Sequence, residues 1–174
     1  IDQGSLSGPG CNSSGTSPPR FLISCISRLS VSVIPGLDTD RILALDTDAR
    51  LNRYASGRWP DHLPEVLGSV LKRSLAASGR FSEVTLSDRP ASGGWFLALE
   101  VQQFYGLQDS GGTTRSVRVA LAGKLLCSGT TIAVDVTEER PVAEERLSLV
   151  VAAHQAALDA ATARLLQQMA KDCG

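Results

Sequence analysis

The chain has 174 residues, a hydrophobic content of 43% and a formal net charge of −1. This amount of apolar material can form the core of one folded domain, and the near-neutral charge lacks the basic character of a nucleic-acid-binding protein. No apolar run approaches the ~20 residues that a helix needs to cross a bilayer, so we expect any membrane contact to depend on an anchor or a partner.

Residues 1–20 differ from the rest of the chain because they are rich in Gly, Ser and Pro. Such a segment buries too little apolar surface to offset the entropy of ordering it. We therefore predict a flexible tether over 1–20 and a single domain over 21–174. Cys11 lies within this tether, where a structural thiol would have nothing to pack against.

The domain is predicted to begin with strands. Leu29 and Val31 alternate with serines, which is the period of a half-buried strand over 21–34. Two short strands over 42–46 and 50–54, joined by a polar turn, predict a hairpin.

An amphipathic helix is predicted to start at the tripeptide Trp59-Pro60-Asp61. We expect the Asp61 carboxylate to accept hydrogen bonds from the first turn, and Gly79 to end the helix in the left-handed conformation. A strand over 81–86 follows. The apolar stripe of the helix recurs at three- and four-residue spacing and consists of Leu63, Val66, Leu67, Val70, Leu71 and Leu75.

The second half of the domain alternates between apolar and polar residues in three further strands, which begin near Trp95, Val117 and Ile132. Short glycine-containing turns between them predict an antiparallel meander. We expect residues 138–141 to end the sheet and a long helix to occupy 144–170. One sheet with its helices on one side would bury every apolar stripe. The predicted fold is therefore α+β, a two-layer sandwich of a mostly antiparallel twisted sheet with two long helices packed on one face.

The sequence contains no P-loop, GxGxxG, GxSxG or HExxH motif, and its four cysteines are not at CxxC spacing. We therefore predict a protein that is not an enzyme and that uses no cofactor and no metal. The alternative is a hydrolase built on His154 and a nearby Ser or Cys, although a satisfied, partly buried histidine is the simpler interpretation. Cys25 and Cys127 are one pair that could form a disulfide in an oxidising compartment.

Tyr54, Arg58 and Trp59 form the remaining group of interest. In one interpretation they make an aromatic corner that closes one end of the core, with Arg58 capping carbonyl groups. In the other, the aromatic rings and the guanidinium are exposed and contact a partner.

Residues 40–84 resemble the core signature of a known family, the auxiliary lipoprotein component of ABC-type transporters. The resemblance extends over residues 20–170 and includes the order of the later strands and the last helix. The matching features are Asp40-Arg41-Ile42, Arg50-Leu51, Tyr54, Arg58-Trp59, Leu63-Pro64 and Ser78-Gly79-Arg80-Phe81.

The resemblance implies a periplasmic lipoprotein of Gram-negative bacteria, with the outer membrane favoured over the inner membrane. Members of this family accompany an ABC permease and an MCE-type substrate-binding protein that move lipids between the two membranes. Cys11, followed by a Pro-containing tether, matches the position of the family's lipid anchor, although Gly8 stands where the lipobox has leucine.

The expected function is therefore that of a non-catalytic accessory lipoprotein, which acts as an interaction module and binds no nucleic acid. Self-association into a homo-oligomer stays open. The alternative function is a periplasmic domain that binds a small hydrophobic ligand, such as a lipid, between the sheet and the helices.

Overall fold

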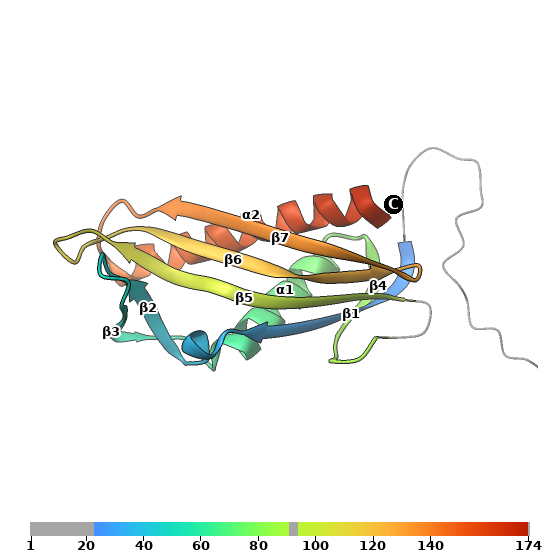
Figure 1. The fold of residues 1–174 in the computed structure, drawn as a ribbon, viewed down its shortest axis with the longest axis horizontal. Helices are drawn as coiled ribbons and strands as arrows, with labels where there is room; N and C mark the ends of the chain where they lie inside the picture. The colour runs from blue at the N-terminus through green and yellow to red at the C-terminus, as the bar shows by residue number, and fades with distance from the viewer. Residues whose placement is uncertain (1–22, 91–93, 174) are drawn as a thin grey trace, which may run out of the picture.

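The computed structural model describes residues 23–90 and 94–173, so the predicted tether over 1–20 and its Cys11 lie outside the described residues. The elements occur in the order β-strands, helix, β-strands, helix (Figure 1). Their bounds are β1 Ile23–Val33, the 3-10 helix η1 Pro35–Leu37, β2 Arg41–Leu45, β3 Leu51–Arg58, α1 Leu63–Ala77, β4 Phe81–Leu86, β5 Trp95–Gln108, β6 Thr114–Cys127, β7 Thr130–Pro141 and α2 Leu147–Cys173.

The seven strands form one mixed sheet around β5. On one side of β5 lie β6 and then β7, both antiparallel to their neighbours, which confirms the predicted meander. On the other side, the first half of β5 pairs with β1 and its last residues pair with β2, both in parallel. The sheet continues outward from β1 to β4 and from β2 to β3.

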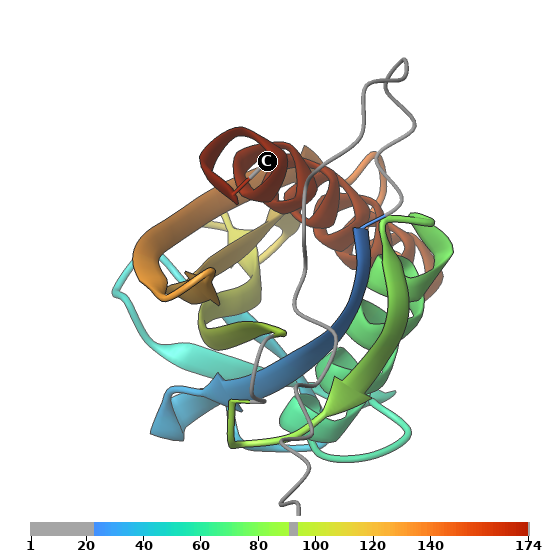
Figure 2. The ribbon, with the colours of Figure 1, turned by 90° about the vertical axis from the view of Figure 1, so that its right-hand side faces the viewer.

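Both helices cover the same face of the curved sheet (Figure 2). The helix α1 packs against β1 and β4, α2 packs against β5, β6 and β7, and the two helices contact each other. The α+β fold class predicted from the sequence is confirmed. The β1–β4 pair is parallel because α1 lies in the connection that carries the chain from β3 to β4 beside β1, as a parallel crossover requires.

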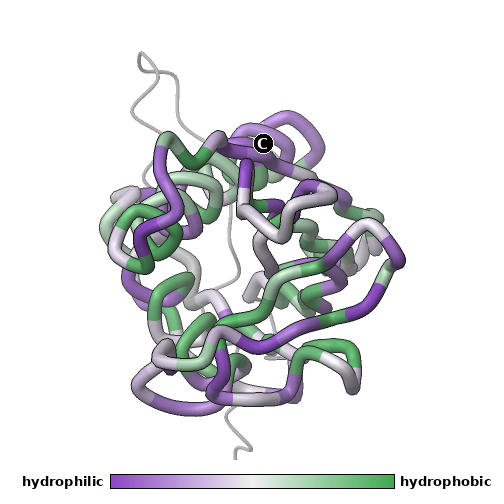
Figure 3. Tube along the Cα trace, turned by 90° about the vertical axis from the view of Figure 1, so that its left-hand side faces the viewer, coloured by the Kyte–Doolittle hydropathy of each residue, from purple (hydrophilic) through white to green (hydrophobic). Residues whose placement is uncertain are grey.

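The core fills the space between the helices and the sheet. Hydrophobic and hydrophilic stretches follow one another along the chain (Figure 3). Over much of β5 and β7, buried and exposed residues alternate, so one face of these strands supplies the core and the other faces outward. The largest fully buried side chains are Leu29, Leu37, Ile42, Leu63, Leu67, Leu71, Leu75, Leu97, Leu121, Leu125, Leu165 and Met169.

The start of α1 differs from the prediction. The helix begins at Leu63, not at Trp59. Among the described residues, the Asp61 carboxylate accepts a hydrogen bond only from the adjacent His62 amide, at 2.8 Å. The preceding segment bends at Pro60 and Asp61, and it is held outside the helix because the Trp59 amide donates to the Asp40 carbonyl and the Leu63 amide donates to the Thr39 carbonyl. The end of the helix is as predicted, with Gly79 at a φ of +68°.

The prediction that residues 138–141 end the sheet is wrong, since β7 stays paired with β6 as far as Pro141. Glu138 is buried there, at 7% exposure. Its carboxylate is neutralised by Arg140 of the same strand at 2.9 Å and by Arg164 of α2 at 2.7 Å. The two arginines thus allow a buried acidic residue inside β7, although the charged residues of this segment led to the prediction that the strand ends there.

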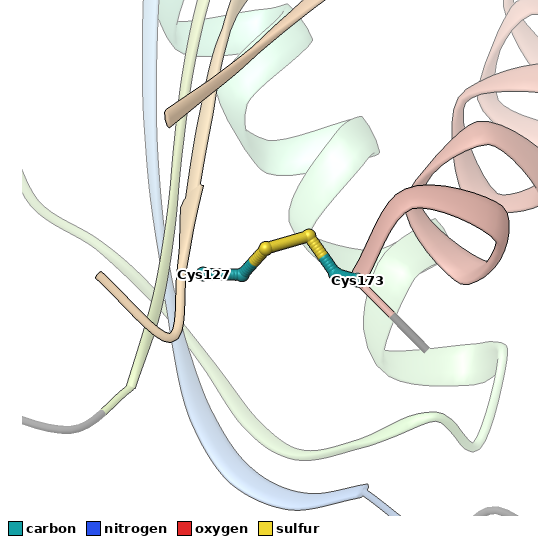
Figure 4. The surroundings of a disulfide bond; sticks show 2 residues. All are labelled: Cys127 and Cys173. Atoms are coloured by element: carbon teal, nitrogen blue, oxygen red, sulfur yellow. A yellow bond between two sulfur atoms is a disulfide. The ribbon is translucent and has the colours of Figure 1, made fainter. Parts of the chain in front are cut away.

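A disulfide joins Cys127, at the end of β6, to Cys173, at the end of α2 (Figure 4). The two Cα atoms are 6.2 Å apart, within the usual span of a disulfide. The predicted Cys25–Cys127 pair is therefore wrong, because the sulfur of Cys127 is already bonded to Cys173. The bond fixes the last turn of α2 to the turn between β6 and β7, and the helix extends to Cys173 instead of ending near residue 170.

Candidate partner-binding site

The three residues singled out from the sequence lie in β3 and directly after it. Tyr54 and Arg58 belong to β3, and Trp59 is the next residue along the chain. β3 is an edge strand that pairs only with β2 within the described residues. We call Tyr54, Arg58 and Trp59 the β3 corner.

Trp59 points into the core. Its ring makes edge-on contacts with Phe104 of β5 and His154 of α2, each with ring centroids 5.6 Å apart. The side chain is half-buried. Aromatic packing of this kind stabilises a core beyond the area that it buries, so Trp59 closes this end of the domain, as the first of the two interpretations proposes.

Tyr54 is half-buried, and its hydroxyl is hydrogen-bonded to the Thr114 hydroxyl at the start of β6. Burial raises the pKa of Tyr54, although the bond to Thr114 acts in the opposite direction. The Thr114 amide in turn donates to the Glu145 carboxylate, at 3.2 Å. Tyr54 therefore ties the exposed edge strand to the meander.

Arg58 is the exposed member of the β3 corner, with 60% of its side chain accessible to solvent. Its guanidinium donates to Asp40 at 3.2 Å, and the other Asp40 oxygen lies 3.8 Å from Arg41. Arg53, also on β3, is exposed and makes no ion pair with any described residue. The corner thus combines two half-buried aromatic rings with the exposed guanidinium of Arg58, which is its most accessible group.

His154 of α2 packs against Trp59 of the β3 corner. The sequence did not reveal this contact. His154 is 1% exposed, its Nδ1 is hydrogen-bonded to the Val150 carbonyl at 2.8 Å, and its Nε2 has no partner among the described residues. Burial lowers its pKa to about 4. The imidazole is therefore neutral, and Trp59 and Phe104 enclose it. A general base needs access to a substrate, which this position does not give.

Across residues 23–90 and 94–173, no three His, Cys, Asp or Glu side chains are grouped as metal ligands. Neither of the described α-helices is long and apolar enough to cross a membrane.

The structure is a small α+β domain, and packed aromatic rings fill the interior of its β3 corner. The family described as the ABC-type transport auxiliary lipoprotein component matches residues 12–170, and the chain belongs to this family. No curated protein matches the chain.

Two solved structures share the fold. The protein XCC0632 from Xanthomonas campestris is 24% identical, with a TM-score of 0.72 and 88% of each chain covered. An uncharacterised protein is 16% identical, with a TM-score of 0.70, and the alignment covers 84% of this chain and 92% of that one. Both comparisons show a shared fold.

Proposed function

We propose that this protein is a periplasmic, lipid-anchored interaction module of an ABC-type system that moves lipids between the two membranes of a Gram-negative cell. The observation that carries the proposal is the match to the transport auxiliary lipoprotein family over residues 12–170. In this proposal Cys11 is the lipid anchor, in the outer membrane, and residues 1–20 are the tether that lets the domain reach its partners.

The disulfide supports a location outside the cytoplasm. Disulfides persist in oxidising compartments such as the periplasm and are rare in the cytoplasm. Cys127 and Cys173 are bonded to each other and fasten the last helix to the sheet, so the bond has a structural role that a reducing compartment would remove.

The partners in this proposal are the ABC permease and its MCE-type substrate-binding protein, and the contact surface is the β3 corner. Arg58 supplies an exposed charge, whereas Trp59 and Tyr54 hold the strand in place from inside. Arginine is favoured at contact surfaces because its planar guanidinium binds carboxylates through two hydrogen bonds.

The interaction role is favoured over catalysis and over ligand binding. A hydrolase would need His154 to reach a substrate, and the ring is enclosed at 1% exposure. A domain that holds a lipid would need space between the layers, and that region is occupied by large, fully buried leucines of α1 and β5, such as Leu67, Leu71 and Leu97.

The test is recovery of the partners with the full-length lipoprotein, expressed in its native host and purified from detergent-solubilised membranes. An Arg58→Glu variant reverses the exposed charge of the β3 corner, and we expect it to lower the recovered permease and MCE-type protein at least about tenfold. Arg115→Glu is the matched control, because Arg115 is 67% exposed and is paired with Asp109 at 2.7 Å, much as Arg58 is paired with Asp40.

Equal recovery with Arg58→Glu and Arg115→Glu would exclude the β3 corner as the contact surface. Absence of both partners from the native preparation would overturn the transport role itself. The intact mass of the same preparation tests the anchor, since the proposal requires acyl groups on Cys11 and a membrane-bound fraction.

A further inference from the structure

The strand β1 is longer than its neighbour β4, and this leaves part of its edge unpaired. The pairing of β4 with β1 ends where Leu86 lies opposite Leu29, and the Ser87 amide closes it by donating to the Leu29 carbonyl at 3.0 Å. Residues 30–33 of β1 continue to pair with β5. β5 occupies one edge of β1, and β4 lies on the other edge. Within the described residues, no strand lies beside this segment on the β4 side.

The direction of the backbone groups follows from the register. In a parallel strand, successive residues direct their N–H and C=O groups to opposite neighbours. The Leu29 carbonyl bonds on the β4 side and the Ile34 amide bonds to Val101 of β5. Val31 and Val33 therefore direct their backbone groups to the β4 side, where the neighbouring strand has ended.

A cleft of about 250 Å³ lies beside this free edge. Leu29 and Val31 of β1, Pro64 and Gly68 of α1, and Leu86 of β4 supply its apolar lining. This volume is below the ~300–1,000 Å³ of sites for small molecules, and it suits one apolar side chain of a longer molecule.

Gly68 is a buried part of the cleft wall, next to Leu86. It lies inside α1, where glycine is less favourable than alanine. A Cβ atom at this position would lie 3.6 Å from the Leu86 methyl groups, which is an ordinary contact. Packing therefore does not require glycine here. Leu86 itself is 44% exposed, more than any other large hydrophobic side chain among the described residues.

Two carboxylates also line the cleft, Glu65 of α1 and Asp88 after β4. Both are exposed, and neither makes an ion pair with a described residue. Asp88 accepts a hydrogen bond from the Ser30 hydroxyl at 2.9 Å. The nearby Arg28 donates to the Arg89 carbonyl and does not line the cleft. The cleft therefore combines an apolar wall with Ser30, Ser87 and two carboxylates that make no ion pair with a described residue. This combination is complementary to an apolar residue that has a cation close by in the same segment.

We propose that this site, the β1 edge cleft, binds an extended segment of a partner protein by strand addition. The segment pairs with the backbone of Val31 and Val33, places one apolar side chain in the cleft beside Leu86 and Val31, and brings a Lys or Arg to Glu65 and Asp88. Main-chain pairing supplies affinity in this mode, and the pocket and its charges supply specificity. The inference rests on the proposed function, since it names the kind of segment that a transport partner would present.

The test uses purified full-chain protein and a fluorescein-labelled peptide of sequence SKVLVKS. We expect saturable binding by fluorescence anisotropy, with NMR amide shifts at Val31, Val33 and Gly68. Each of two control peptides removes one interaction. SEVLVES reverses the charges, and a version with N-methylated valines cannot form main-chain hydrogen bonds with the strand edge. Each is expected to bind at least about tenfold more weakly.

Gly68→Leu fills the pocket and is expected to lower the affinity for SKVLVKS at least about tenfold, whereas Ser69→Leu, on the exposed side of α1, leaves it unchanged. Gly68→Ala is the milder variant. It is expected to fold with equal or higher thermal stability and to weaken binding by a smaller factor. Unchanged affinity in folded Gly68→Ala and Gly68→Leu proteins would overturn the proposal.

The absence of binding up to about 1 mM peptide, or binding with shifts confined to the β3 corner, would also overturn it. The measurement needs no transport partner. Its failure therefore leaves the proposed function intact, and failure to recover the permease leaves the peptide result intact.

Discussion

His154 is a residue whose surroundings set how the stability of the domain depends on pH. Burial lowers its pKa to about 4, whereas an unfolded histidine titrates near 6.5. Between these two values the unfolded chain binds a proton that the folded protein does not bind. The contribution of His154 to the free energy of unfolding is therefore complete above about pH 6.5, and it is lost as the pH is lowered toward 4. The gap corresponds to about 3 kcal/mol.

A His154→Leu variant should remove most of this dependence, because it has no group that titrates in the window. Urea unfolding at pH 7 and pH 4.5 measures the effect. His62→Gln is the control: His62 is exposed, and its bond to Asp38 raises its pKa, so its contribution has the opposite sign and is lost as pH rises. If His154→Leu loses as much stability as the native protein, another group governs this range.

At the scale of single elements, the last helix depends on a covalent bond to the sheet. The disulfide closes a loop with a sequence separation of 46 residues, and loop-closure entropy for this length is about 4 kcal/mol. Replacing Cys127 and Cys173 together by serine is expected to lower the free energy of unfolding by about 2–4 kcal/mol. Denaturant unfolding measures the loss, and reductant should lower the stability of the native protein but not that of the double variant.

At the scale of the whole molecule, β5 joins parts of the sheet that have little contact with each other. It pairs with β1, β2 and β6, whereas β3 is an edge strand whose residues are mostly exposed. Local opening follows burial and pairing. Native-state hydrogen exchange is therefore expected to be slowest in the centre of β5 and fastest in β3. Equal protection of the two strands would show that the sheet opens only as one unit.

The sequence predicts the elements whose pattern is local. The alternation in β1 and in the meander, the apolar stripe of α1 and the glycine at its end each arise from residues close together in the chain, so the fold class follows from them. The match to the family adds that the chain belongs to the transport auxiliary lipoprotein family.

The features that the sequence does not predict depend on residues far apart in the chain. The bond between Cys127 and Cys173, the burial of Glu138 against Arg164, and the packing of His154 on Trp59 require the helix and the sheet to be docked first. The β1 edge cleft arises from a difference in length between two strands. No residue type signals that difference in strand length.

The position of β1 has a mechanical consequence for a protein held by its N-terminal side. β1 is the first strand of the described chain, and it lies between two parallel neighbours, β4 and β5. A pull transmitted from that side acts along the strand, so the hydrogen bonds on both edges bear the load together, in shear. An edge strand in a hairpin would instead open one bond at a time. If the domain is anchored and tethered at its N-terminal side as proposed, it would resist tension applied along β1.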